Sequence, residues 1–369
     1  MAGIMNPTSS PLVSIVVPVY NDAEFLAECL ESILAQTYHN WDCLIVNNCS
    51  SDDSAQIAHQ YVARDRRFRL HENAQHLRAV CNYNAGLRLI SPDSSYCKIV
   101  FADDWIFPEC LAQMVALAEE NPSVGIVGAF GLRGNEVVWA GLPYPCRKVS
   151  GRKICRALLL HDFYVFGTAT ALLYRSDLVR NRNPFYNESN LHCDSEVCLV
   201  LLKSCDFGFV HQVLTFTRVR PGSLTSLSAE INTVIAGKLY DLMMYGKDFL
   251  SESEFRSRRA YWLRDYYHFL ARQLGKGRNR EFWAYHKRKL RESGVGYSRL
   301  RLALALLEQF LGALLNPLRT VRRLLNREDM QVGTGFVDFS AESDAVAVFP
   351  GGEATPGAIG LGNRSEGHT

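Results

Sequence analysis

Between residues 13 and 130 the chain alternates short apolar runs with segments whose apolar residues recur at helical spacing. A short apolar run bounded by polar residues is typical of a strand buried on both faces. We expect strands at 13–19, 43–46, 68–70, 97–102 and 124–130, and helices at 25–34, 54–64, 79–90 and 108–120. This alternation favours an α/β fold with a mainly parallel sheet that is covered by helices on both faces.

The rest of the chain divides into three further parts. Residues 131–225 are more irregular and resemble the second half of a mixed sheet, with strands expected at 169–174 and 207–219 and a helix at 196–204. The pattern from about 231 to 326 is helical, and beyond 331 it loses periodicity, so we expect a disordered tail. The predicted organisation is an N-terminal arm (1–10), a sheet domain (11–228), a basic helical extension (229–330) and the tail (331–369).

Cysteine usage indicates a reducing compartment, and hydropathy indicates that the chain does not cross a membrane. The chain has 11 cysteines, an odd number, and no CxxC pair, so neither a disulfide scaffold nor a zinc site is expected. The first ten residues have no basic region of the kind that opens a secretion signal. The longest apolar segment, 302–315, is interrupted by Glu308 and Gln309, so we expect no membrane-spanning helix and a cytoplasmic protein.

Polar clusters follow three of the expected strands. Tyr20-Asn21-Asp22 follows the first strand, residues 47–52 follow the second, and Asp103-Asp104 follows the strand at 97–102. In parallel α/β sheets, ligands bind outside the carboxyl ends of the strands. The three clusters are therefore expected to meet at one edge of the sheet and to form a site there.

The adjacent carboxylates of Asp103 and Asp104 are the most specific part of this pattern. Two neighbouring carboxylates raise each other's pKa unless a cation or a donor compensates. A hard divalent ion with oxygen ligands would compensate, and such ions are often shared with substrate phosphates. The alternative is that one Asp caps the following turn while the other is solvated.

Taken in order, these segments resemble a family 2 glycosyltransferase with the GT-A fold. The resemblance rests on Val13-Ser-Ile-Val-Val-Pro-Val-Tyr-Asn, Leu34-Ala-Gln-Thr-Tyr, the polar loop at Asn47 and Phe101-Ala-Asp-Asp-Trp-Ile-Phe-Pro, and it covers about residues 11–225. It implies a Rossmann-like, mainly parallel mixed sheet, here with a C-terminal helical extension. It also implies transfer of a sugar from a nucleotide-diphosphate sugar, usually with inversion, using Mg²⁺ or Mn²⁺.

The resemblance assigns expected roles to single residues near the donor. Pro18 and Tyr20 match the loop that lies against the nucleotide base, and Asn48 matches the residue that hydrogen-bonds the base. Arg78 matches a basic residue near the nucleotide. Asp103 and Asp104 match the metal-binding motif, with Asp103 also near the donor. We expect a UDP-sugar as the donor and a glycan or a lipid-linked molecule as the acceptor.

The resemblance also assigns residues to the reaction itself. Asp194 matches the second residue of a Glu-Asp pair and is the expected catalytic base, which takes the proton of the acceptor hydroxyl. We expect it just before a helix whose N-terminus keeps its pKa low. Arg218 and Arg220 match a stretch near the diphosphate, where a guanidinium can form a bidentate clamp. The alternatives are a helix cap for Asp194 and a solvated edge strand for the arginines.

Three departures from the family pattern leave a second hypothesis open. Asn48 replaces an acidic residue, Phe101 stands where many members have another Asp, and Cys193 replaces the first acid of the pair. A catalytically inactive protein that keeps the fold and binds a nucleotide sugar or a partner is the alternative to an enzyme of cell-surface polysaccharide synthesis. His192 is either part of the site or a surface histidine.

The predicted helical extension carries most of the positive charge. Residues 231–330 contain 20 Lys and Arg against 10 Asp and Glu, whereas the whole chain has a net charge of only +2. A basic helix with an apolar face indicates binding to an anionic membrane surface, here the inner face of the cell membrane. A solvated helical cap is the alternative. No nucleic-acid-binding motif accompanies the charge, so we expect no nucleic acid partner.

Overall fold

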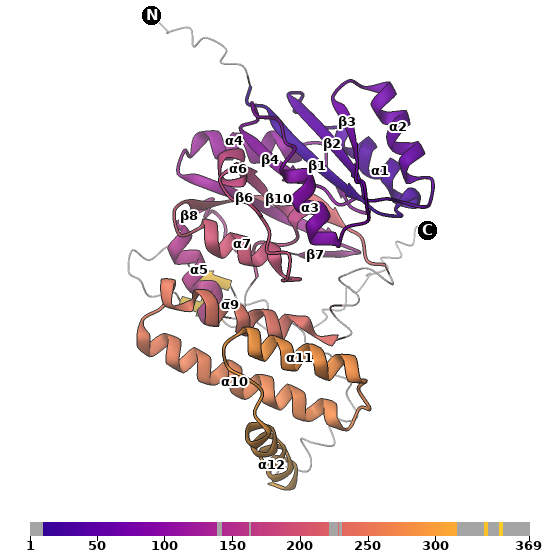
Figure 1. Cartoon of the computed structure of the whole chain (residues 1–369). Coiled ribbons are helices and arrows are strands. Elements are labelled where there is room, and N and C mark those ends of the chain that lie inside the picture. Colours follow the sequence, from indigo (N-terminus) through magenta and orange to yellow (C-terminus); the bar gives the residue numbers. More distant parts are fainter. Residues whose placement is uncertain are drawn as a thin grey trace, which may run out of the picture.

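The computed structural model describes residues 10–138, 142–161, 164–220, 228, 231–315, 336–338 and 347–349. The upper part of Figure 1 is an α/β layer structure, and the lower part is a group of helices. The two parts correspond to the expected sheet and the expected helical extension.

A 10-stranded mixed sheet forms the centre of the α/β part, with the order β3-β2-β1-β4-β9-β6-β10-β5. β7 adds to β6, and β8 adds to β10. Strands β3, β2, β1 and β4 are parallel, and β9 runs antiparallel between β4 and β6. The strands are β1 (Val13–Val19), β2 (Trp41–Asn47), β3 (Phe68–Glu72), β4 (Tyr96–Ile99), β5 (Trp105–Ile106), β6 (Val124–Arg133), β7 (Glu136–Val138), β8 (Lys148–Val149), β9 (Leu173–Arg175) and β10 (Asp206–Thr217).

Helices cover both faces of the sheet, and each face has its own hydrophobic core. The helices are α1 (Ala23–Leu34), α2 (Ser54–Arg64), α3 (Ala79–Leu87), α4 (Cys110–Glu120), α5 (Gly151–Leu160), α6 (Ser176–Arg180) and α7 (Cys193–Leu201). Every residue of β1 is buried, as expected for a strand that is packed on both faces. Gly86 of α3 lies so close to β1 that a Cβ there would meet Val16 at 2.4 Å.

The C-terminal helices pack against one face of the α/β part. They are α9 (Thr233–Phe249), α10 (Glu252–Leu274), α11 (Arg280–Glu292) and α12 (Arg299–Leu315). One hydrophobic cluster contains Val16 and Ile99 of the sheet together with Leu239 of α9 and Leu270 of α10. The sheet and the helices therefore share a core.

Most of the predicted elements are confirmed, and two differ in position. Residues 169–174 form a short 3₁₀ helix (Ala169–Ala171) followed by β9, where one strand is predicted. Thr170 explains the break, because its hydroxyl accepts the N–H of Phe101 and donates to Asp104, which competes with regular strand pairing. The helix expected at 196–204 begins at Cys193, three residues earlier.

Both ends of the chain lie largely outside the described residues, and so do residues 316–326 of the predicted helical region. Within the predicted disordered tail, the structure describes β11 (Phe336–Asp338) and β12 (Ala347–Phe349), which pair antiparallel. At these two strands the structure differs from the expected disorder, because two short β-prone segments can satisfy each other's backbone groups. In the part of the chain that the structure describes, none of the helices has the length and hydropathy needed to cross a bilayer.

Candidate active site

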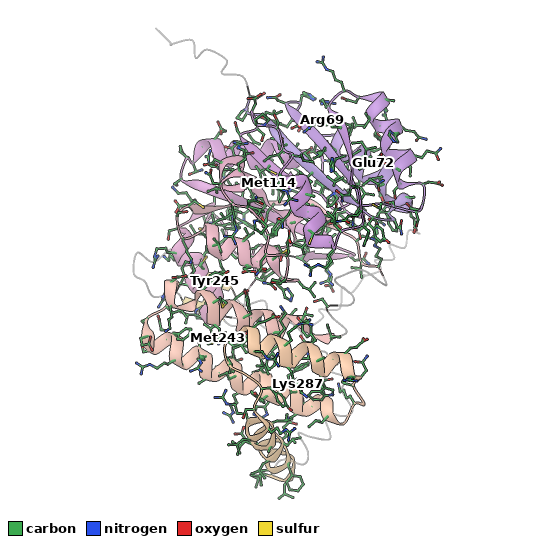
Figure 2. The ribbon with its side chains drawn as sticks, viewed as in Figure 1. Arg69, Glu72, Met114, Met243, Tyr245 and Lys287 are labelled. Carbon is green, nitrogen blue, oxygen red and sulfur yellow. The ribbon has the colours of Figure 1, made fainter. Side chains whose placement is uncertain are left out.

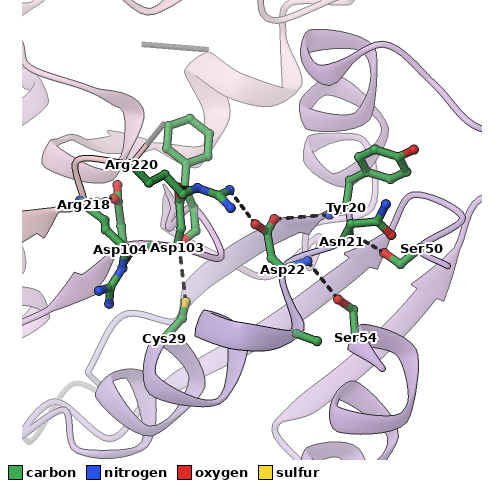
Figure 3. A network of polar contacts seen from close by, with 12 residues as sticks. Tyr20, Asn21, Asp22, Cys29, Ser50, Ser54, Asp103, Asp104, Arg218 and Arg220 are labelled. Atoms are coloured by element: carbon green, nitrogen blue, oxygen red, sulfur yellow. Dashed lines mark hydrogen bonds and ion pairs between the residues drawn. The ribbon is translucent and has the colours of Figure 1, made fainter. Parts of the chain in front are cut away.

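The carboxyl ends of β2, β1 and β4 meet at one edge of the sheet, as the strand pattern predicts. The parallel pairing of β1 with both neighbours brings the loops after Val19, Asn47 and Ile99 to this edge. Figure 3 shows Asp22 from the first loop and Asp103 from the third on either side of Arg220. The structure thus assembles one polar site from segments that are far apart in the sequence.

Arg220 forms the centre of this site. Its Nε donates to Oδ2 of Asp103 at 2.8 Å, and one terminal nitrogen donates to Oδ1 of Asp22 at 2.5 Å (Figure 3). Burial raises the pKa of Asp22, and the guanidinium of Arg220 opposes this rise. One arginine therefore balances two carboxylates at the edge of the sheet where a diphosphate is expected.

Asp104 lies deeper, and protein groups bind both of its oxygens. Thr170 Oγ1 donates to Oδ2 at 2.7 Å, and the backbone N–H of Arg218 donates to Oδ1 at 3.0 Å. Burial and the neighbouring charge of Asp103 raise the pKa of Asp104 to about 7. Behind it, the buried Lys98 Nζ donates to the Thr170 carbonyl at 2.6 Å and so supports the residue that holds Asp104.

The two carboxylates match part of the ligand set of a hard divalent cation. Among the described residues, no group of three or more His, Cys, Asp or Glu side chains could hold a metal alone. Mg²⁺ is commonly bound by one or two carboxylates, with the remaining positions filled by substrate phosphates and water. The donor chemistry of Asp103 and Asp104 fits a cation that binds together with a diphosphate.

Arg218 points away from Arg220 and is held by several groups. Its Nε donates to the backbone carbonyl of Asp103 at 3.0 Å, and its guanidinium pairs with Glu28 and lies 4.3 Å from the ring centroid of Phe25. The end of β10 is thereby fastened to the Asp103-Asp104 loop. Arg220 is the arginine that faces the carboxylates, and Arg218 positions the loop.

Of the side chains expected at the nucleotide base, Tyr20 is exposed, whereas Pro18 and Asn48 are buried. Tyr20 is 48% exposed, and its ring centroid is 4.4 Å from that of His76. Pro18 lies within β1, paired with Val46 of β2, and Arg78 is exposed just before the start of α3. The exposed ring of Tyr20 is a surface on which a flat base can stack.

Asn48 is buried and makes hydrogen bonds through both ends of its amide. Its Oδ1 accepts from the backbone N–H of Leu77 and from Asn73, both at 2.9 Å, and its Nδ2 donates to the Leu77 carbonyl at 2.8 Å. In this structure Asn48 therefore holds the loop at 73–77 in place. Hydrogen bonding of its oxygen to a base would require one of these partners to be replaced.

Asp194 lies inside the first turn of α7 rather than before it. Its Oδ1 accepts the N–H of Ser195 at 2.8 Å. Burial nevertheless outweighs the hydrogen bonds and raises the pKa of Asp194 to about 6. The expectation of a low pKa is therefore wrong, because burial destabilises the ionised carboxylate more than the helix N-terminus stabilises it.

Tyr83 of α3 lies next to Phe101, two residues before Asp103. Burial raises its pKa, and the negative charges of Asp103 and Asp194 raise it further. Its ring also packs against Phe101 with centroids 5.1 Å apart. Tyr83 therefore packs beside the chain segment that leads into Asp103 and Asp104.

Helix α9 packs directly on the segment that carries Asp194. His192 contacts Thr233 Oγ1 through Nε2 at 2.9 Å, and a Cβ on Gly237 would lie 2.6 Å from the His192 ring. Burial lowers the pKa of His192. The histidine is largely buried, and it forms the contact between α9 and the start of α7.

A second contact between α9 and α7 is made of buried carboxyl groups. Glu196 accepts hydrogen bonds from Asn187, Asn190 and Tyr245. Asp241 of α9 is 7% exposed, and its Oδ1 has no hydrogen-bond partner among the described residues. Figure 2 shows Tyr245 at the junction of the α/β part and the helical part. The helical part therefore contacts the site segment through polar groups as well as the shared core.

Comparison with known proteins shows which proteins this chain resembles. Residues 14–180 match the family described as glycosyl transferase family 2. The chain is 31% identical over 160 residues to EpsE of Bacillus subtilis, covering 41% of this chain and 56% of EpsE. It is 30% identical over 121 residues to the glycosyltransferase GlyG of Streptococcus pneumoniae, covering 33% of this chain and 40% of GlyG. The chain thus spans about half the length of these relatives or less.

Solved structures share the fold. TarS 1–349 of S. aureus in complex with UDP-GlcNAc has a TM-score of 0.56 at 16% identity, covering 79% of this chain and 86% of that chain. The mannosyltransferase PcManGT of Pyrobaculum calidifontis, in complex with GDP-Man and Mn²⁺, has a TM-score of 0.50 at 17% identity, covering 88% and 90%. The fold is that of the GT-A glycosyltransferases, and residues 14–180 are similar to family 2 glycosyltransferases.

Several residues of the site were not identified from the sequence. Lys98 is a charged residue inside an otherwise apolar strand, and this was a signal that it has a buried partner. Asp22 stood in a polar cluster that the sequence did identify. Tyr83, Thr170 and Gly237 gave no local signal, because their roles depend on elements that meet only in the folded chain.

Proposed function

We propose that the protein is an enzyme that transfers a sugar from a nucleotide-diphosphate sugar to a hydroxyl group of a glycan or a lipid-linked acceptor. The transfer inverts the anomeric carbon, depends on Mg²⁺ or Mn²⁺, and serves cell-surface polysaccharide synthesis at the inner face of the membrane. The observation that carries the proposal is the polar site at the carboxyl ends of β1 and β4, where Arg220 bridges Asp22 and Asp103. We propose a UDP-sugar as donor, since TarS has been crystallised with UDP-GlcNAc.

We propose a separate role for each side chain in such a transfer. Asp194 accepts the proton of the acceptor hydroxyl while that oxygen forms a bond to the anomeric carbon. The bond from this carbon to the diphosphate breaks, and its electron pair leaves with the nucleoside diphosphate. Arg220 lies at this edge of the sheet and is the residue proposed to donate hydrogen bonds to the departing phosphate oxygens. A divalent ion held by Asp103 and Asp104 would supply further positive charge to the leaving group.

A panel of nucleotide sugars with Mg²⁺ or Mn²⁺ tests the proposal. We expect one donor to raise the melting temperature and to be consumed when acceptor is present. Asp194→Asn should lower transfer by about 10²- to 10⁴-fold, the usual contribution of a general base, while donor binding remains. The pair Asp103→Asn and Asp104→Asn should abolish the metal dependence of donor binding.

Asp93→Asn is the matched control, because Asp93 is an exposed aspartate outside the site. Donor binding without transfer under any condition would favour the non-catalytic binding protein. Full transfer by Asp194→Asn would refute the base assignment, and the absence of binding to any nucleotide sugar would refute the proposed function.

A further inference from the structure

Helix α12 exposes an apolar face that no described element covers. Its outward leucines recur at spacings of three and four residues, which places them along one side of the helix: Leu300, Leu304, Leu307, Leu311 and Leu314. Leu300 and Leu314 are 71% and 66% exposed. Isolated exposed leucines need no explanation, but a continuous stripe of them marks an interaction surface.

The opposite side of α12 is already occupied. Leu302 and Ala305 are buried against the helical part, and α12 packs on α10. Glu308 pairs with Arg264 and His268 of α10, which fixes the rotation of α12 about its own axis. The exposed stripe is therefore held outward by the fold. In Figure 1, α12 lies at the end of the molecule farthest from the sheet.

Positive charge borders the stripe. Arg299 and Arg301 at the start of α12 are exposed and form no ion pair with any described residue. Arg301 also lines a groove of about 290 Å³ between α10 and α12, together with Leu304, Arg264 and His268. An apolar strip flanked by unpaired arginines has the composition of a helix that lies at a membrane interface.

We propose that α12 lies in the plane of an anionic membrane, with its leucine stripe inserted among the acyl chains and Arg299 and Arg301 against lipid phosphates. The inference rests on the proposed function for its biological role, which is to hold the active site near a lipid-linked acceptor. It makes the general expectation of membrane association specific to one face of one helix.

A second copy of the chain is the competing occupant, and the size of the stripe argues against it. A helix of 17 residues is about 25 Å long and about 10 Å wide, so its outward face offers about 250 Å². A stable dimer buries about 800 Å² per partner.

Flotation of the full chain with vesicles tests the proposal. We expect binding to vesicles of phosphatidylglycerol and phosphatidylcholine and much weaker binding to pure phosphatidylcholine. The triple variant Leu300→Ser, Leu307→Ser, Leu311→Ser should bind the anionic vesicles at least about tenfold more weakly. Arg299→Gln with Arg301→Gln should reduce the preference for anionic lipid.

The control is Leu89→Ser with Leu274→Ser, since both leucines are exposed (40% and 46%) and lie outside α12. This variant should bind like the wild type, and circular dichroism should show all variants folded. Equal vesicle binding by the triple variant and the wild type would overturn the proposal, as would a wild type that binds no vesicle. A dimer in solution that the triple variant converts to a monomer, without vesicle binding, would assign the face to a second copy instead.

Nucleotide binding, measured in the same samples by thermal shift, separates this inference from the proposed function. Loss of vesicle binding with nucleotide binding intact supports the α12 assignment. Absence of nucleotide binding in the wild type counts against the proposed function. In that case the vesicle assay still tests whether α12 binds a membrane.

Discussion

The proposed role of Asp194 follows from its residue type and its place in the sequence, but its pKa depends on its surroundings in the fold. Its position in the Leu191–Glu196 segment was enough to propose it as a base, but the expected low pKa followed only from its nearness to a helix start. In the structure, burial raises its pKa to about 6. A carboxylate whose pKa lies close to the working pH is a stronger base than a carboxylate with the ordinary pKa of about 4.

A pH dependence follows from this raised pKa. Asp194 must be deprotonated to accept the acceptor proton, so the turnover rate should be half-maximal near pH 6 and fall about tenfold per pH unit below it. The measurement is kcat against pH at saturating donor, with donor affinity recorded at each pH as the control. An acidic limb centred near pH 4, the range of an ordinary Asp, would show that burial does not control this group.

At the scale of elements, α9 determines how the start of α7 is held. Gly237 allows the His192 ring to lie against the helix, and Thr233 bonds the same ring. Asp194 is only two residues further along the chain. A helix of the C-terminal part is therefore expected to position a residue of the α/β part, which the sequence pattern did not indicate.

Gly237→Ala tests this coupling. The new Cβ would lie 2.6 Å from the His192 ring, so we expect a loss of about 1–3 kcal/mol in the free energy of unfolding. We also expect a lower kcat with little change in donor KM, because the displaced segment carries the proposed base, Asp194, and none of the residues proposed to bind the donor. Urea denaturation and steady-state kinetics give the two quantities.

Gly275→Ala is the matched control, since a Cβ there meets no atom within 4 Å and its φ of −78° suits any residue. Its unfolding free energy and kcat should both stay close to the wild type. A Gly237→Ala protein that is destabilised but keeps the wild-type kcat would show that α9 supports the fold without positioning Asp194.

At the scale of the whole molecule, the shared core makes the two predicted domains interdependent. The cluster that lines one face of the sheet continues through Leu239 of α9 and Leu270 of α10 without a break. Units that share one core unfold together, in contrast to domains joined by a linker. A boundary near residue 228 remains a prediction about sequence organisation.

Calorimetry of Leu239→Ala tests this interdependence. Leu239 is 1% exposed, so its truncation should cost about 2–5 kcal/mol and lower the melting temperature of the whole protein in a single transition. Leu274→Ala removes an exposed leucine of α10 and should have little effect. Two transitions, of which only one moves in Leu239→Ala, would mean that the helical part folds separately.

Sequence patterns predicted the structure best where it depends on neighbouring residues in the chain. The apolar runs predicted the central strands because burial on both faces requires continuous apolar residues, and Asp103 and Asp104 were found because they interrupt such a pattern. Elements held by distant partners were misplaced or missed. Thr170 shows the reason, since its bonds to Asp104 and Phe101 divide a segment that reads locally as one strand.

The sequence by itself determined the fold class, the edge of the sheet where the site lies, and the residue types that the site contains. These follow from hydrophobic periodicity and from the chain's order of strands and loops. Only the tertiary structure decided the pairing of Arg220 with Asp22 and Asp103, the raised pKa of Asp194, and the contact of α9 with His192. Such properties depend on distance and desolvation between segments far apart in the chain, and no local pattern encodes them.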